Sequence, residues 1–108
     1  MSTFYGMRVE ISGFSASRVE GVKKAAEEEW PFDTWAEYKG ELSSYAESSL
    51  CGGETEEEFA DRLAKAVWAA NNGFCLLTID ATYLHELPYE THIRDEFDYE
   101  RLLKEKPS

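Results

Sequence analysis

The fold is decided by a stretch in the second half of the chain, residues 74–84, which reads FCLLTIDATYL. Every second side chain along it is apolar or aromatic, namely Cys75, Leu77, Ile79, Ala81 and Tyr83. Most of the side chains between them are polar, and Asp80 is charged. Because successive side chains of a strand point to opposite faces of a sheet, this alternation predicts a strand with one buried face and one wetter face. Such a strand suits a sheet that helices cover on one side only.

Two further strands are predicted upstream. Residues 4–14 alternate in the same way, and their apolar face consists of Tyr5, Met7, Val9 and Ile11. Residues 41–50 are also expected to be extended, with Leu42, Ala46 and Leu50 in phase. Residues 32–39 fit either a short helix or a short strand, and Gly40 ends that element in both cases.

Two helices are predicted between these strands, at residues 17–29 and 56–72, because apolar side chains recur there at helical spacing. Each predicted helix opens with a Ser or Thr that is followed three residues later by Glu. This pattern is a capping box, and the pairs are Ser17 with Glu20 and Thr55 with Glu58.

The elements follow one another as βαβαβ, or as βαββαβ if residues 32–39 form a strand. We therefore predict an α/β (α+β) fold, a two-layer sandwich with two helices on one face of a small sheet, which is ferredoxin-like in the second case. Residues 1–88 form this domain, and residues 89–108 are a polar C-terminal extension with a short helix from Tyr99, capped by Asp98. The predicted core consists of Val9, Ile11, Val22, Trp30, Phe59, Leu63, Val67, Leu77 and Ile79.

Charge is distributed unevenly over the 108 residues, whose formal net charge is −11. Residues 25–61 contain twelve acidic residues and one lysine, whereas the rest of the chain has ten acidic and ten basic residues. Direct nucleic-acid binding needs a basic surface, so we expect none here. A segment this acidic is instead suited to attract a basic protein partner.

Nothing in the sequence directs the chain to a membrane or out of the cell. No basic segment followed by an apolar run opens it, and no apolar stretch is long enough for a membrane span. We therefore expect a cytoplasmic protein whose two thiols, Cys51 and Cys75, are reduced and not bonded to each other. Closely spaced pairs of Cys or His are missing from the sequence, so we expect no metal and no cofactor.

The second predicted helix carries one aromatic residue outside its core stripe. Phe59, Leu63 and Val67 share the inner face, whereas Trp68 lies about 180° from Phe59, among acidic residues such as Asp61. A tryptophan with an acidic rim is typical of an interface hot spot. The alternative is that the tail or a loop covers Trp68 within the same fold.

Two runs of three glutamates stand in opposite positions on the predicted helices. Glu56–Glu58 lie in a first turn, where the helix dipole favours negative charge. Glu27–Glu29 lie in a last turn, where negative charge is mildly unfavourable, so the pattern indicates a functional reason for them. The alternative is a solvated acidic face that keeps the protein soluble.

One region offers residues for catalysis. Asp80, His85 and His92 lie on or after the last predicted strand, where a general acid–base pair could form. Ordinary solvated polar residues explain the same pattern. We therefore expect no catalytic residue, and a small enzyme that uses this region is the second alternative.

In size, charge segregation and the acidic runs Glu27–Glu29 and Glu54–Glu58, the chain resembles the small acidic inhibitor proteins of phages and mobile elements, including anti-CRISPR and anti-restriction DNA mimics. The resemblance implies a protein-binding module that occupies the nucleic-acid-binding surface of a basic partner. The charge pattern and the tryptophan give the expected partner-binding residues: Glu27, Glu28, Glu29, Glu54, Glu57, Glu58, Asp61 and Trp68. The first alternative is a plain homodimer or structural interaction protein whose acidity is incidental.

Overall fold

The structure is a computed structural model that describes residues 3–50, 54–83 and 89–104. Its strands are β1 (Thr3–Ser12), β2 (Ala36–Tyr38), β3 (Glu41–Leu50), β4 (Leu76–Tyr83) and β5 (Glu90–Arg94). Its helices are α1 (Val19–Glu29), α2 (Glu56–Asn71) and α3 (Glu96–Lys104). The α+β fold that the sequence predicts is confirmed, as are the two main helices and the short C-terminal helix.

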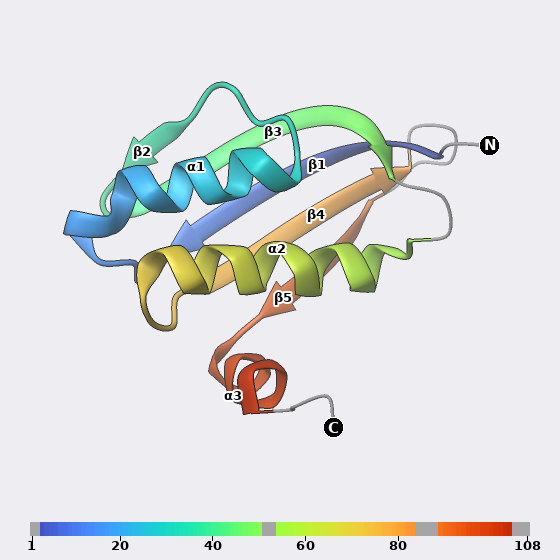
Figure 1. Ribbon diagram of the computed structural model, residues 1–108. Helices are drawn as coiled ribbons and strands as arrows, with labels where there is room; N and C mark the ends of the chain where they lie inside the picture. Colours follow the sequence, from blue (N-terminus) through green and yellow to red (C-terminus); the bar gives the residue numbers. More distant parts are fainter. Residues whose placement is uncertain (1–2, 51–53, 84–88, 105–108) are drawn as a thin grey trace.

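The five strands form one antiparallel sheet in the order β2-β3-β1-β4-β5. The first four strands and the two main helices follow the βαββαβ order of a ferredoxin-like fold, because residues 36–38 form a strand. The fifth strand lies beside β4 and forms an additional edge (Figure 1).

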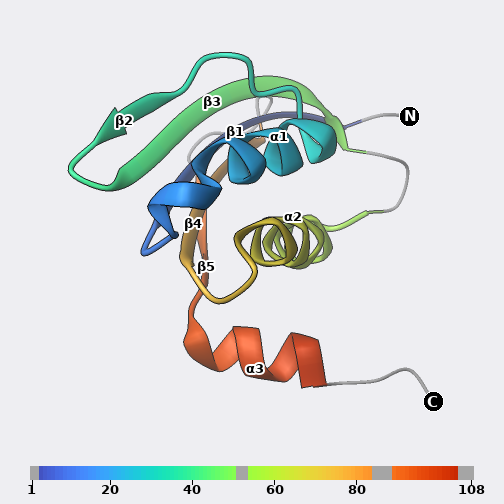
Figure 2. The ribbon, with the colours of Figure 1, turned by 60° about the vertical axis from the view of Figure 1, so that its left-hand side comes forward.

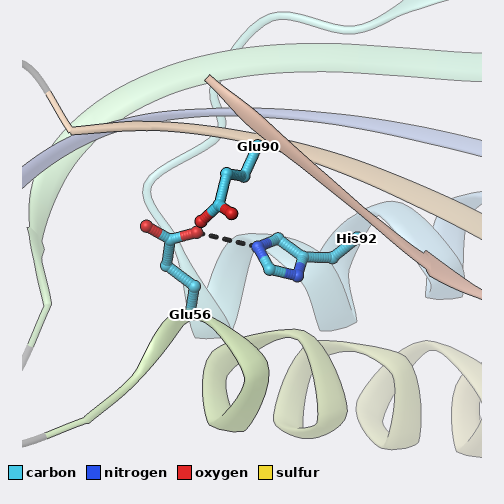
Figure 3. A group of neighbouring side chains, drawn as sticks. All are labelled: Glu56, Glu90 and His92. Carbon is cyan, nitrogen blue, oxygen red and sulfur yellow. Dashed lines mark hydrogen bonds and ion pairs between the residues drawn. The ribbon is translucent and has the colours of Figure 1, made fainter. Parts of the chain in front are cut away.

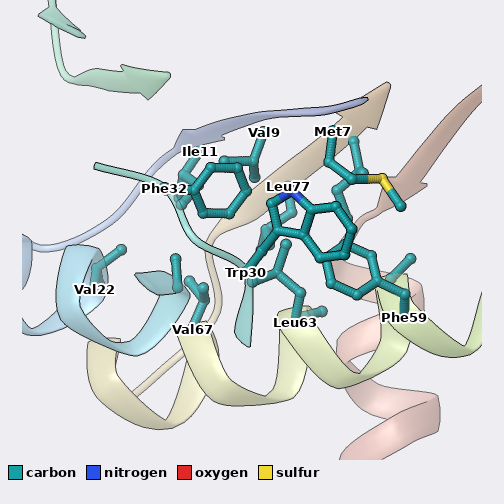
Figure 4. Close-up of a cluster of buried hydrophobic side chains, with 14 of the residues drawn as sticks. Met7, Val9, Ile11, Val22, Trp30, Phe32, Phe59, Leu63, Val67 and Leu77 are labelled. Carbon is teal, nitrogen blue, oxygen red and sulfur yellow. The ribbon is translucent and has the colours of Figure 1, made fainter. Parts of the chain in front are cut away.

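Both main helices lie on the same face of the sheet, and the opposite face stays uncovered (Figure 2). The hydrophobic core fills the space between these two layers. All nine predicted core residues are buried there, together with neighbours such as Met7 and Phe32 (Figure 4). Complete burial of a large apolar side chain contributes about 1.5–3 kcal/mol, so this layer is the main source of stability.

The two predicted capping boxes have different outcomes. Thr55 and Glu58 form theirs, with the Glu58 N–H donating to the Thr55 hydroxyl and the Thr55 N–H donating to the Glu58 carboxylate. The Ser17 box is wrong, because Ser17 lies inside a 3-10 turn, Ala16–Arg18, that precedes α1. That turn is closed by the Arg18 N–H donating to the Ser15 carbonyl, and no side chain caps α1.

The C-terminal part departs most from the prediction. The segment expected to be a polar extension begins with β5, an edge strand of the same sheet. The helix after it starts at Glu96 and not at Tyr99, because Asp95 is its N-cap. Asp98 is the third helical residue and accepts a hydrogen bond from the Asp95 N–H in return.

The uncovered face of the sheet is partly aromatic and apolar. Its exposed large side chains are Phe4, Tyr38, Tyr45, Leu76 and Ile93. Tyr45 lies across β1 above Gly6, where any larger side chain would collide with its ring. None of the described helices has the length and apolar character that crossing a membrane requires.

Candidate functional site

Acidic residues from two helices gather at one end of the molecule. The helices α1 and α2 run antiparallel, so the last turn of α1 lies beside the first turn of α2 (Figure 1). The residues of this end, which we call the acidic end, are Glu27, Glu28, Glu29, Glu54, Glu56, Glu57 and Glu58. The acidic runs that the sequence separates by more than twenty residues therefore lie at the same end of the helical layer.

Arg62 holds part of the acidic end together. Its guanidinium donates two hydrogen bonds to Glu54, at 2.9 and 2.8 Å, and a third to Glu29. It also lies 5.0 Å from the centre of the Phe59 ring. The hydrogen bonds to Glu54 and Glu29 raise the pKa of Arg62 despite its partial burial. Two of the expected partner-binding carboxylates are thus neutralised in part by one internal cation.

A second group of ion pairs joins α2 to β5. Arg94 is buried and donates to Glu57 at 2.7 Å and to Asp61 at 2.8 Å. The His92 ring lies between two carboxylates, with Nδ1 3.1 Å from Glu57 and Nε2 2.8 Å from Glu56. The hydrogen bond from Arg94 lowers the pKa of Glu57, and the proximity of His92 lowers it further. These carboxylates hold an edge strand onto a helix, which is a structural role.

Three acidic residues remain more available to a partner. Glu27 is exposed and accepts a hydrogen bond from the Trp35 indole at 2.9 Å. Glu58 is exposed although its carboxylate completes the cap of α2. Glu28 is exposed, and among the described residues it has no hydrogen bond or ion pair. The acidic end thus consists of carboxylates that stabilise the fold and a smaller set that faces solvent, centred on the last turn of α1.

Trp68 is not on the surface. Its side chain is 1% exposed, its indole N–H donates to the Cys75 carbonyl at 2.8 Å, and Tyr99 of α3 packs edge-on against it at 5.1 Å. The expectation that this face of α2 meets water is therefore wrong, and the alternative of a covering tail is correct. A shallow pocket of about 240 Å³ remains beside Trp68, between Lys65 and Leu103.

Two residues of the alternative catalytic region, Asp80 and His92, lie on opposite faces of the sheet. Asp80 lies on the uncovered face of the sheet and accepts a hydrogen bond from Thr91. His92 pairs in register with Ile79 and therefore faces the helices, on the opposite side from Asp80. His85 lies outside the described residues.

The thiol prediction can be followed for one cysteine. Cys75 is fully buried with a free thiol, and burial raises the pKa of that thiol to about 12. Such a thiol is unreactive at neutral pH. Cys51 lies outside the described residues, so the absence of a bond between the two stays a prediction.

The sequence interpretation missed a cluster at the inner edge of the acidic end. Glu56, Glu90 and His92 place their potential metal-ligating atoms within 4.8 Å of one another (Figure 3). Glu90 and His92 are two residues apart in β5 and hence share a face. The alternation of Glu90, His92 and Arg94 is the signal that could have revealed both the strand and the cluster.

Comparisons with known proteins give no relative: no protein-family model, no curated protein and no solved structure matches the chain. The function is therefore inferred from the geometry and charge of this chain alone.

Proposed function

We propose that the chain is an acidic protein-binding module that occupies the nucleic-acid-binding surface of a basic partner. The observation that carries the proposal is the convergence of seven glutamates at one end of the helical layer, from α1, from α2 and from Glu54, which precedes the N-cap of α2. The proposal assigns no catalytic role to any residue. It places the action of the protein in the cytoplasm, where such partners hold nucleic acid.

The mechanism is electrostatic competition. Carboxylates at fixed positions present negative charges to the arginines and lysines that otherwise contact phosphates. Complementary charge accelerates the encounter and selects the partner, while the bound module excludes nucleic acid by its volume. The last turn of α1 is best suited to this contact, because Glu27 and Glu28 are exposed and are not held by any ion pair within the described chain.

The experiment compares two double charge reversals of equal size. Glu27→Lys/Glu28→Lys changes the acidic end, and Glu29 is left unchanged because it pairs with Arg62. The control, Glu37→Lys/Glu41→Lys, changes two exposed glutamates of β2 and β3 that do not belong to the acidic end. Both variants have the same net charge, so any difference between them reports position and not total charge.

Partners are captured from an extract of the native cell on the immobilised chain, identified, purified, and titrated with fluorescently labelled duplex DNA. We expect the wild-type chain to displace the DNA, the acidic-end variant to do so at least about tenfold less well, and the control to behave like the wild type. A partner that keeps its DNA at saturating wild-type chain would contradict DNA mimicry. Equal losses in the two variants would show that position is irrelevant and would also reject the proposal.

A homodimer is the second candidate, favoured by the five exposed large side chains on the uncovered face of the sheet. Light scattering after size-exclusion chromatography gives the molecular mass directly. A dimer that Ile93→Lys converts to a monomer would support this candidate, since Ile93 is exposed on that face. A monomeric wild type at high concentration would reject it.

A further inference from the structure

The cluster of Glu56, Glu90 and His92 has the form of a metal-binding site. Glu56 is the first residue of α2, and Glu90 and His92 come from β5. Figure 3 shows the three side chains pointing toward one another between the helix and the strand. Their donor atoms, two carboxylate oxygens and one imidazole nitrogen, lie within 4.8 Å of one another. Only small side-chain shifts are needed to bring all three to the ~2.0–2.2 Å from one ion that zinc ligands adopt.

The surroundings of His92 match those of a metal-ligating histidine. Its Nδ1 lies 3.1 Å from the Glu57 carboxylate, a partner that can orient the ring as the outer contacts of metal-ligating histidines do. The other nitrogen, Nε2, lies 2.8 Å from the Glu56 carboxylate. A proton held between Nε2 and Glu56 makes this contact a charged hydrogen bond, and a metal ion binds such a pair by displacing that proton. A divalent cation at this point would be attracted by both groups.

The ligands are positioned by further contacts. The Tyr5 hydroxyl donates a hydrogen bond to the Glu56 carboxylate. Arg94 in turn holds Glu57, the partner of His92. Such outer contacts orient metal ligands and are a regular part of metal sites.

The three ligand side chains differ in how far they are exposed to solvent. The side chains of His92 and Glu56 are 9% and 18% exposed, whereas Glu90 is exposed at the rim. An ion held by the two buried ligands would therefore be reached from solvent past Glu90. A water molecule from that side would serve as the fourth ligand of a tetrahedral ion.

We propose that Glu56, Glu90 and His92 bind a single divalent transition-metal ion, with zinc as the ion that this donor set fits best. One nitrogen and two oxygen donors suit zinc. Calcium takes six to eight oxygen ligands, and magnesium demands an oxygen octahedron, so neither suits the site. The bound ion would fasten the first turn of α2 to the edge strand β5. This proposal is independent of the partner that the acidic end binds.

The test uses full-length protein that a chelator has stripped of metal, with Cys51→Ser in every sample so that the Cys51 thiol cannot bind the ion. Zinc chloride is titrated by calorimetry, and thermal melts are recorded with and without zinc. Glu90→Gln is the main variant, because Glu90 is exposed and its loss leaves the ion pairs of α2 intact. Glu28→Gln is the matched control, since it removes an exposed charge from the acidic end without touching the cluster.

We expect one equivalent of zinc to bind and to raise the melting temperature, since a ligand that binds only the folded state stabilises it. Zinc binding should weaken at least about tenfold in Glu90→Gln and remain within about twofold in Glu28→Gln. Nitrogen NMR should show the Nε2 signal of His92 shifting with zinc and not with magnesium. No binding, or equal affinities of the two variants, would overturn the proposal and leave the cluster as an ion-pair network.

Discussion

The helices α1 and α2 lie side by side on the same face of the sheet, and each contains three consecutive glutamates, yet their surroundings differ. The run in α2, Glu56–Glu58, bonds to His92, Arg94 and Thr55, so every member of it helps to hold the fold. In the run of α1, Glu29 bonds to Arg62, Glu27 only to the partly buried Trp35 indole, and Glu28 to no described residue. The same three-residue run is therefore bonded throughout in α2, whereas in α1 two of its three members face solvent.

The difference shows how acidic runs should be weighed. Carboxylates in the first turn of a helix stabilise that helix locally, because they accept hydrogen bonds from the free N–H groups and are favoured by the helix dipole. Carboxylates in a last turn have no such local role, because the helix dipole disfavours negative charge there, so they call for another explanation. Substitutions in and around the two helices test this difference between their glutamate runs.

The largest effect is expected on the outer side of α2, which α3 covers. Trp68→Ala removes a side chain that is 1% exposed and should lower the free energy of unfolding by about 3–5 kcal/mol. The corresponding aromatic residue near α1 is Trp35, which is only partly buried and packs against Phe32. Trp35→Ala should therefore lower the free energy of unfolding, measured in urea, by clearly less than Trp68→Ala does. Equal losses would show that α2 is no more enclosed than α1.

The second-largest loss of stability is expected when the ion pairs between α2 and β5 are broken. Arg94→Met leaves Glu57 and Asp61 without their buried cation and should cost about 2 kcal/mol, a typical value for charged hydrogen bonds that are partly exposed to water. Arg101→Met removes an exposed pair with Asp98 and should cost less than about 0.5 kcal/mol. Denaturant unfolding of both variants measures the contrast. A small loss in Arg94→Met would remove the structural role that we assign to these carboxylates.

The same ion pairs predict a dependence on pH. Arg94 lowers the pKa of Glu57 below its ordinary value of 4.5, so the ionised carboxylate stabilises the fold above that pH. This contribution is lost as pH falls through the lowered pKa and Glu57 takes up its proton. The stability difference between wild type and Arg94→Met should therefore shrink well below pH 4.5. A difference that stays constant in acid would contradict the pairing.

The smallest effects on stability are expected from single substitutions in the two glutamate runs, which compare the runs directly. Glu58→Ala removes half of the capping box and should cost about 1 kcal/mol. Glu28→Ala removes a carboxylate without a described partner at a helix end and should change stability by less than about 0.5 kcal/mol. Thermal melts of the two variants give this comparison. A destabilised Glu28→Ala would show that the run of α1 also serves the fold.

The core and most of the architecture could be predicted from the sequence. Regular apolar spacing predicts β1, β4 and the inner face of α2, because the same residues that alternate or recur are the ones that pack. It did not predict β5, whose inward side chains, His92 and Arg94, are polar and are buried through ion pairs with α2. Hydrophobic periodicity has no signal for a strand of that kind.

The candidate site was less predictable than the fold for the same reason. Charge along the chain predicts the partner-binding set, whereas the roles of Glu29, Glu54 and Asp61 depend on arginines that folding brings to them. Helical spacing predicts Trp68 on the surface because it describes one helix and carries no information about a second helix that packs over it. Contacts between distant segments decide which charges remain free.

We propose that the last turn of α1 binds a basic partner through charge. The most direct measurement is the slope of log Kd against log salt concentration for the partner captured by the wild-type chain, compared with Glu27→Lys/Glu28→Lys. Salt screens contacts between exposed charges, so we expect a steep slope for the wild type and a clearly shallower slope, with weaker binding, for the variant. Identical slopes and affinities for the two proteins would contradict the claim.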